Sequence, residues 1–225
     1  MGVVSPCLLP DVALLDANLT TGLPPHVTAA TGIDAMVHAI EAYTSKIKKN
    51  PYSDMLARQA LTLMSRHIVD AVDDGDNVDA RQALLLGAMM AGQAFANAPV
   101  GAVHALAYPL GGHYHIPHGL SNSLVLPPVL RFNACVAEPL YAELLPAVSG
   151  DSYSSASDGC EAFITHMEQL ITRVELPTTL EEMAIQEQDL PMLASDAMEQ
   201  QRLLINNPRD VSEIDALAIY NEIYT

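Results

Sequence analysis

The sequence predicts an all-α fold, organised as one multi-helix domain over residues 1–225 with a single short strand near its start. The first observation is composition: Trp is absent and Phe occurs three times, whereas Ala, Leu and Met are frequent, which favours helices over strands. The second is an apolar spacing of three and four residues through most of the chain. The third is that no repeat or long linker divides a chain that is 50% hydrophobic, which is enough for one core.

The first half of the chain is expected to contain the strand and three long helices. Residues 12–16, VALLD, follow Pro10 and form the one stretch that is typical of a strand. Pro25 and Pro51 occupy positions that favour the first turn of a helix. The expected helices cover residues 24–45, 51–72 and 78–97, and the polar loop DDGDN separates the second from the third.

The second half is expected to be helical, with interruptions at glycine and proline. Gly111-Gly112 is predicted to break or kink the backbone. Pro127-Pro128 is predicted to kink a helix that opens at His118. The expected helices cover residues 118–132, 138–148, 160–174, 190–204 and 212–224.

Charge and cysteine usage exclude several classes of function. The formal net charge is −17, which argues against nucleic acid or an anionic membrane as a partner, because both require basic surfaces. The three cysteines are odd in number and lack a CxxC spacing, so neither a disulfide framework nor a cysteine zinc site is indicated. No signal peptide and no apolar run of roughly twenty residues is present, so the expected location is the cytoplasm.

One stretch, residues 101–133, concentrates histidine. It holds four of the eight histidines and contains no Asp, Glu or Lys. They are His104, His113, His115 and His118. Burying a polar ring without a partner costs a few kcal/mol, so these rings require a metal ion, a helix terminus or a backbone carbonyl.

A second motif, about seventy residues earlier, supplies further ligands. In a helix, Asp34 and His38 lie at positions i and i+4 and therefore share one face. Such a pair by itself indicates a hydrogen bond on a helix surface. Together with a histidine cluster it favours a site in which a carboxylate and an imidazole hold one divalent ion.

Four residues are therefore the candidate metal ligands: Asp34, His38, His104 and His118. One carboxylate and three imidazoles suit Fe²⁺ or Zn²⁺ and disfavour Ca²⁺ and Mg²⁺, which prefer oxygen ligands. His113 and His115 are alternatives for the same role, although their alternation predicts an exposed loop that faces substrate or solvent. The isolated His26, His67 and His166 are interpreted as ordinary surface or core histidines.

Three segments carry a resemblance to a known family. These are GIDAMVHAIEAY, VHALAYPLGGHYHIPHG and NNPRD, and together they resemble the iron-containing, or group III, alcohol dehydrogenases. The resemblance extends over essentially the whole chain and implies the helical C-terminal domain of that family. It also implies that the four candidates are the metal ligands, with Fe²⁺ favoured and Zn²⁺ as the alternative. Phe95 matches an aromatic position near the substrate channel.

The implied activity is a metal-dependent oxidoreductase that passes hydride between a small alcohol or aldehyde and NAD or NADP. A homo-oligomer is compatible with this interpretation. Two departures from the family pattern matter. Tyr108 replaces a histidine that many members carry four residues after the position of His104, so it is expected to serve as a catalytic hydrogen-bond donor rather than a proton carrier.

The second departure concerns the cofactor. No glycine-rich phosphate loop and no series of βα units occur in these residues, so the α/β nucleotide-binding domain of the family is expected to be absent and NAD or NADP to bind weakly. Two alternatives stay open: a stand-alone metal-binding domain without turnover, and a helical metallohydrolase. The chain contains no His-Asp dipeptide, which argues against the hydrolase.

Overall fold

The computed structural model describes residues 5–8 and 10–225, which form helices and short 3-10 turns without a strand. The α-helices are α1 (Pro25–Thr44), α2 (Pro51–Asp73), α3 (Val78–Asn97), α4 (Ala102–Tyr114), α5 (His118–Val148), α6 (Ala156–Arg173), α7 (Leu190–Ala197), α8 (Gln201–Leu204) and α9 (Glu213–Glu222). The 3-10 turns are η1 (Pro6–Leu8), η2 (Ala17–Thr20), η3 (Glu181–Met183) and η4 (Glu187–Asp189). The predicted all-α helical domain is therefore confirmed.

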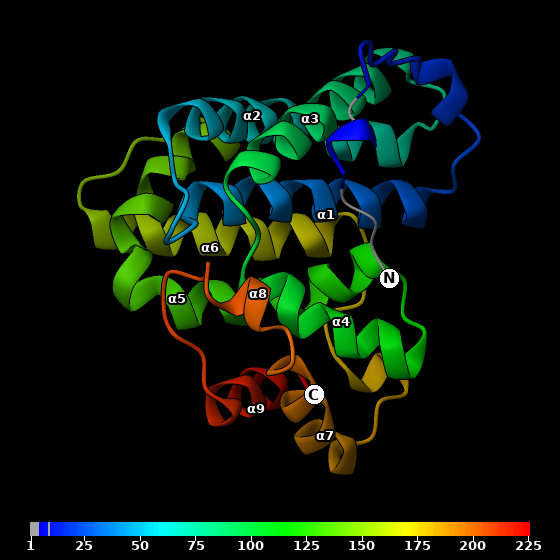
Figure 1. Cartoon of the computed structure of the whole chain (residues 1–225). Coiled ribbons are helices and arrows are strands. Elements are labelled where there is room, and N and C mark those ends of the chain that lie inside the picture. The colour runs from blue at the N-terminus through cyan, green and yellow to red at the C-terminus, as the bar shows by residue number, and fades with distance from the viewer. Residues whose placement is uncertain (1–4, 9) are drawn as a thin grey trace.

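Helix α1 lies at the centre of the fold (Figure 1). It packs against α2 and α3 on one side and against α5 on the other, while α6 runs along α5. Helix α4 contacts α5 and also α7, which packs against α9 at the lower end of the view. Fourteen of the twenty residues of α1 are buried, so the helix that carries Asp34 and His38 is held from several sides.

Three of the six long helices, α2, α3 and α6, begin with a side-chain cap. The side chains of Asn50, Asn77 and Ser155 accept backbone N–H groups at the starts of α2, α3 and α6. Ser212 and Asp215 form a reciprocal capping box at the start of α9. Helix α4 has the N-cap Gly101, which offers no side-chain acceptor, so groups from elsewhere in the chain must satisfy its first N–H donors.

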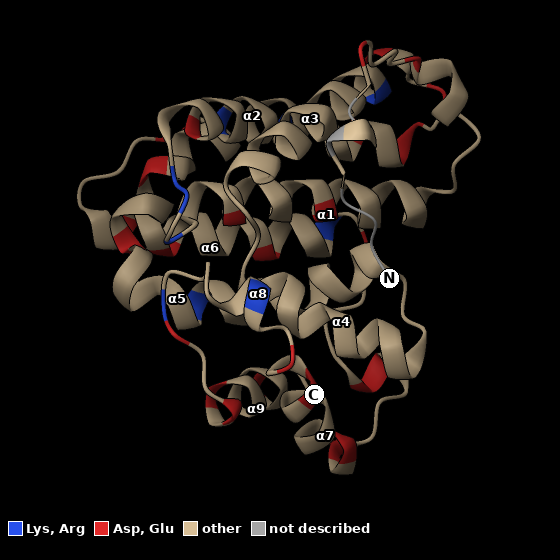
Figure 2. Ribbon diagram, in the orientation of Figure 1, with Lys and Arg blue, Asp and Glu red and all other residues tan. Residues whose placement is uncertain are grey.

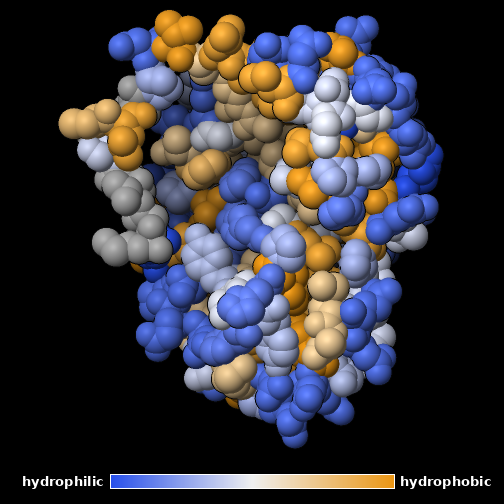
Figure 3. All heavy atoms as spheres, turned by 90° about the vertical axis from the view of Figure 1, so that its right-hand side faces the viewer, coloured by the Kyte–Doolittle hydropathy of each residue, from blue (hydrophilic) through white to orange (hydrophobic). Residues whose placement is uncertain are grey.

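The predicted strand at residues 12–16 is wrong. These residues form irregular backbone, and Val12 and Leu14 are 80% and 89% exposed. Among the described residues there is no second strand to pair with, so the alternation of apolar residues has no sheet to support. Figure 3 shows the face that lies on the right-hand side in Figure 1, where apolar side chains border a hollow.

The sequence predicts that the backbone breaks or kinks at Gly111-Gly112, and the structure shows no break there. Both glycines lie inside α4, which continues to Tyr114. The chain turns at His115, which adopts a left-handed conformation with φ 56° and ends the helix. The cost of a glycine in a helix, about 1 kcal/mol relative to alanine, is offset here by buried neighbours such as Leu106 and Leu110.

Helix α5 is longer than predicted. The sequence indicates two segments separated near residues 133–137, whereas the structure has one helix of 31 residues with four prolines inside it. Each proline removes a single backbone hydrogen bond. Burial of side chains along the helix, including Leu130 and Leu144 on either side of the predicted gap, keeps the segments in one element.

Acidic residues are spread over the outer faces of most helices, and lysine and arginine are sparse (Figure 2). This distribution agrees with the net charge of −17. No single helix in residues 5–8 and 10–225 is both long and apolar enough to cross a membrane. The consecutive helices α3 and α4 are together long and apolar enough to span a membrane, but they are bent by 107° relative to each other.

Candidate metal centre

Three helices bring the four predicted ligands together. Helix α1 supplies Asp34 and His38, α4 supplies His104 near its start, and α5 supplies His118 as its first residue. Oδ1 of Asp34 lies 3.8 Å from Nε2 of His104 and 3.8 Å from Nε2 of His118. Donor atoms of these three residues all lie within 4.8 Å of one another.

His38 completes the cluster through its contact with His104. The two Nε2 atoms are 3.0 Å apart, and the ring centroids are 4.6 Å apart. His104 is buried, Asp34 and His38 are half-buried, and the side chain of His118 is 49% exposed. The cluster is therefore closed on the side of His104 and open to solvent on the side of His118.

The geometry and chemistry of these donors fit a transition-metal ion. Two adjacent donors bound to one ion at roughly 2.1 Å lie about 3.0–3.4 Å apart. The separations of 3.0 Å and 3.8 Å are close to that range. Three imidazole nitrogens and one carboxylate oxygen form a donor set that suits Fe²⁺ or Zn²⁺ and not a cation that requires oxygen ligands alone.

The surroundings shift the proton affinities of the three rings in different directions. Burial, helped by the neighbouring His104, lowers the pKa of His38 to about 4. Burial also lowers the pKa of His118. Burial opposes protonation of His104 as well, but the charge and hydrogen bond of Glu41, together with Asp34, raise the pKa of this ring above its ordinary value. A proton in the cluster therefore resides on His104.

Two buried polar residues next to the cluster were missed in the sequence. The Glu41 carboxylate accepts from Nδ1 of His104 at 2.6 Å. Nδ2 of Asn122 donates to Oδ1 of Asp34 at 2.5 Å and lies 3.2 Å from Nε2 of His118. The signal was present in the spacing, because Glu41 follows His38 by three residues and Asn122 follows His118 by four, which places each pair on one helix face.

The amide of Asn122 also leaves one atom without a partner. Its Oδ1 is buried and has no hydrogen-bond partner among the described residues. Its Nδ2 lies between two of the proposed ligand atoms. The NH₂ group of Asn122 thus faces Oδ1 of Asp34 and Nε2 of His118, the same two atoms that would bind a cation.

The alternative histidines lie outside the cluster. His113 pairs with Asp196 of α7, and His115 is the residue that ends α4. The expectation of an alternating loop at these residues is wrong, because His113 is helical. His166 of α6 lies elsewhere, with its Nε2 3.2 Å from Oγ of Ser65 of α2.

The two aromatic residues singled out in the sequence flank the cluster. The ring of Phe95 stacks on His38, with centroids 4.6 Å apart and an interplanar angle of 21°. The ring of Tyr108 lies 5.8 Å from that of His118, and both Phe95 and Tyr108 are half-buried. Phe95 thereby covers one face of His38, and Tyr108 borders the open side at His118.

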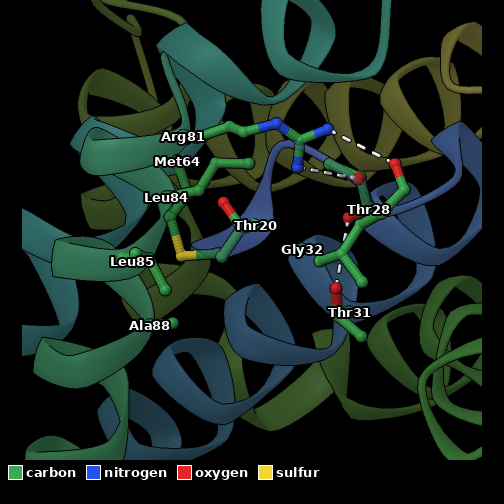
Figure 4. Close-up of a pocket in the computed structure, with 10 residues that line it drawn as sticks. Thr20, Thr28, Thr31, Gly32, Met64, Arg81, Leu84, Leu85 and Ala88 are labelled. Carbon is green, nitrogen blue, oxygen red and sulfur yellow. Dashed lines mark hydrogen bonds between the residues drawn. The ribbon is translucent and has the colours of Figure 1, made fainter. Parts of the chain in front are cut away.

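A cavity of about 200 Å³ lies between η2, α1, α2 and α3, and none of the four candidate ligands lines it (Figure 4). Arg81 lies at its edge and is 3% exposed. Its guanidinium donates to Oγ1 of Thr28 at 3.3 Å and to the carbonyl of Leu23 at 3.4 Å, and it also bonds the carbonyl of Gly75. No carboxylate in the described part of the chain pairs with it, so Arg81 ties two loops to α1 through uncharged acceptors.

Comparison with known proteins gives a consistent result. The sequence model described as the Fe-containing alcohol dehydrogenase family, C-terminal, matches residues 28–224. The chain is 42% identical over 218 residues to long-chain-alcohol dehydrogenase 1 of Geobacillus thermodenitrificans (strain NG80-2). The aligned residues make up 96% of this chain and 55% of that protein.

Solved structures agree with the sequence match. A crystal structure of 1,3-propanediol oxidoreductase superposes with a TM-score of 0.90 at 36% identity and covers 93% of this chain and 55% of that one. The iron-containing alcohol dehydrogenase of Thermococcus thioreducens has a TM-score of 0.87 at 31% identity, with 99% and 57% coverage. The chain spans about half the length of the relatives that it matches.

Proposed function

The chain belongs to the iron-containing alcohol dehydrogenase family, and from its site we propose that it carries the metal centre of a nicotinamide-dependent alcohol dehydrogenase. The observation that supports this most strongly is the convergence of Asp34, His38, His104 and His118 from three helices. Relatives are named for 1,3-propanediol and for sulfoacetaldehyde, so the proposed substrate is a small alcohol or aldehyde.

The four converging residues would hold the ion, with Fe²⁺ as the first choice and Zn²⁺ as the second. A divalent ion bound there supplies Lewis-acid polarisation of an alcohol or carbonyl oxygen, which favours hydride exchange with NAD or NADP. This chain's residues provide the rest of the setting. His104 and Glu41 form the closed, buried side, and the exposed His118 marks the side from which a substrate can enter.

Phe95 and Tyr108 have distinct proposed roles at that entrance. Phe95, stacked on His38, shields the ring from water and offers an apolar surface to the carbon chain of a substrate. Tyr108, beside His118, is positioned to donate a hydrogen bond from its hydroxyl group.

Two measurements on the purified chain test the proposal. Elemental analysis and titration with Fe²⁺ or Zn²⁺ determine whether one ion binds per chain. Absorbance of the reduced nicotinamide then reports oxidation of 1,3-propanediol by NAD and NADP, with and without the ion. Metal-dependent reduction of either cofactor supports the whole proposal. Binding of metal without turnover is the result expected either from weak binding of NAD and NADP or from a metal-binding domain without activity, and calorimetric titration of the metal-loaded chain with both cofactors separates the two. Absence of metal binding would contradict both.

A cytoplasmic location and a homo-oligomeric state are further parts of the proposal. All three cysteines are free, which is compatible with a reducing compartment. Cell fractionation and sedimentation analysis test these two points independently of the metal.

A further inference from the structure

Glu41 makes two hydrogen bonds with one buried carboxylate. The residue is 6% exposed and lies on α1, three residues after His38. Its Oε2 accepts from Nδ1 of His104 at 2.6 Å, and its Oε1 accepts from the backbone N–H of Val103 at 2.7 Å. Both oxygens are therefore occupied by donors from the first turn of α4.

The first of these bonds determines which nitrogen of His104 carries the proton. An ionised carboxylate can only accept hydrogen bonds, so Nδ1 of His104 must be the N–H donor. In the neutral ring Nε2 then keeps its lone pair. That atom lies 3.0 Å from His38 Nε2 and 3.8 Å from Asp34 Oδ1, on the side of the cluster where the other donors converge.

The second bond helps to cap the start of α4, together with Asn207, whose Oδ1 accepts from the backbone N–H of Ala102 at 3.3 Å. The N-cap residue Gly101 provides no side-chain acceptor, and the N–H of Val103 is one of the first-turn donors that lack a partner within the helix. Glu41 satisfies that donor from α1 and places a negative charge at the positive end of the helix dipole. Part of the capping of α4 and the orientation of the His104 ring thus depend on the same side chain.

We propose that Glu41 is a positioning residue, which directs Nε2 of His104 into the metal centre and for which a carboxylate is required. This inference rests on the proposed function only in taking His104 as a ligand. The requirement follows from counting acceptors: two N–H groups need one each, and a glutamine amide offers a single oxygen.

Glutamine at this position must leave one partner poorly matched. If its oxygen accepts from Val103, its NH₂ group faces Nδ1 of His104 and favours the tautomer with the proton on Nε2, which blocks the ligand atom. If its oxygen accepts from His104, the NH₂ group faces the N–H of Val103 and two donors oppose each other at the start of α4. Either arrangement weakens the centre without changing the size of the side chain.

The test compares Glu41→Gln with Glu161→Gln, a matched change at an exposed glutamate on α6. Far-ultraviolet circular dichroism checks that both variants keep their helices. Titration with Zn²⁺ should show affinity reduced by roughly tenfold to a hundredfold in Glu41→Gln, the range typical for loss of a group that orients a ligand. Glu161→Gln should bind as the unaltered chain does. Equal affinity in all three proteins would overturn the proposal.

A second readout does not involve metal. Nitrogen-15 spectra of the histidine rings in the metal-free chain, recorded at about pH 9 where the rings are neutral, report the tautomer of His104. We expect the proton on Nδ1 in the unaltered chain and a shift toward Nε2 in Glu41→Gln. A proton on Nε2 in the unaltered chain would refute the assignment, even if Glu41→Gln fails to fold. If the chain binds no Zn²⁺ at all, the proposed function fails while the tautomer still decides the role of Glu41.

Discussion

Nε2 of His38 lies 3.0 Å from Nε2 of His104, although the two residues are 66 positions apart in the chain. Two imidazole nitrogens at this distance can share one proton or bind one cation between them. Asp34 and His118 bring two further donors within 4.8 Å of His104, so a cation is the occupant that we propose.

The first prediction concerns the ligands themselves. Asp34→Ala and His104→Ala should each reduce bound metal to a small fraction of one ion per chain, because each removes a donor from the cluster. His113→Ala is the control, since His113 is exposed and pairs with Asp196 instead. Elemental analysis after dialysis is the measurement. Loss of metal in the control, or its retention in the two variants, would mean that the site is elsewhere.

The second prediction is a pH dependence of metal binding. His104 has a raised pKa, so a proton competes for its Nε2 from near-neutral pH downward and affinity should fall as pH falls. The lowered pKa values of His38, about 4, and of His118 mean that these rings do not compete until the medium is more acidic. Release of one proton per ion corresponds to about a tenfold change in affinity per pH unit. Zn²⁺ titrations across this range should show that slope, and affinity independent of pH would exclude His104 as a ligand.

The third prediction uses two glycines in neighbouring helices. A Cβ at Gly119 would lie 2.5 Å from the carbonyl oxygen of Ala30, so Gly119→Ala must push α5 away from α1. We expect a loss of about 1–3 kcal/mol in the free energy of unfolding. Metal binding should weaken as well, because His118 precedes Gly119 directly and would move away from Asp34.

Gly112→Ala is the matched control for that substitution. Nothing lies within 4 Å of a Cβ built at Gly112, which is helical and exposed. Alanine there should stabilise the chain by roughly 0.5–1 kcal/mol and leave metal affinity unchanged. Urea unfolding of the two variants gives the comparison, and equal effects would show that the contact between α1 and α5 is looser than described.

The fourth prediction tests the role of Tyr108. If its hydroxyl group donates a hydrogen bond and carries no proton, Tyr108→Phe should lower the rate of alcohol oxidation by about fivefold, the equivalent of roughly 1 kcal/mol. Loss of a general acid or base would instead cost about a hundredfold or more. Tyr114→Phe, on the same helix but bonded to Asp189, should leave the rate unchanged. A hundredfold loss in Tyr108→Phe would contradict the proposed role.

Local spacing explains why parts of the site could be predicted from the sequence. Asp34 and His38 are one turn apart, so a helix is sufficient to place them on one face. His104 and His118 were selected by their shared apolar stretch and by family resemblance, while the choice between them and His113 or His115 depends on where α4 ends. The left-handed residue at which it ends is His115, a position where glycine would be the more usual signal.

Other features depend on contacts that the sequence does not display. The spacing places Glu41 and Asn122 on the helix faces of His38 and His118, but it does not show that they are buried. Their burial beside the proposed ligands follows from the hydrogen bonds that link α1 to α4 and to α5. The segment 12–16 has the alternation of a strand, but alternation forms a sheet only where a neighbouring strand pairs with it. Tertiary packing, not propensity, also decides that α5 continues through its prolines.

The convergence of donors from α1, α4 and α5 has a consequence for the lifetime of the protein. An ion at this point would act as a reversible cross-link between distant segments, and the unfolded chain, which does not gather these donors, would have little affinity for it. Mass action then stabilises the folded chain by about 2.7 kcal/mol when free metal exceeds its dissociation constant a hundredfold. Chains made under metal starvation would forgo that margin and be unfolded and degraded more often, so the supply of metal would govern how much of the protein persists.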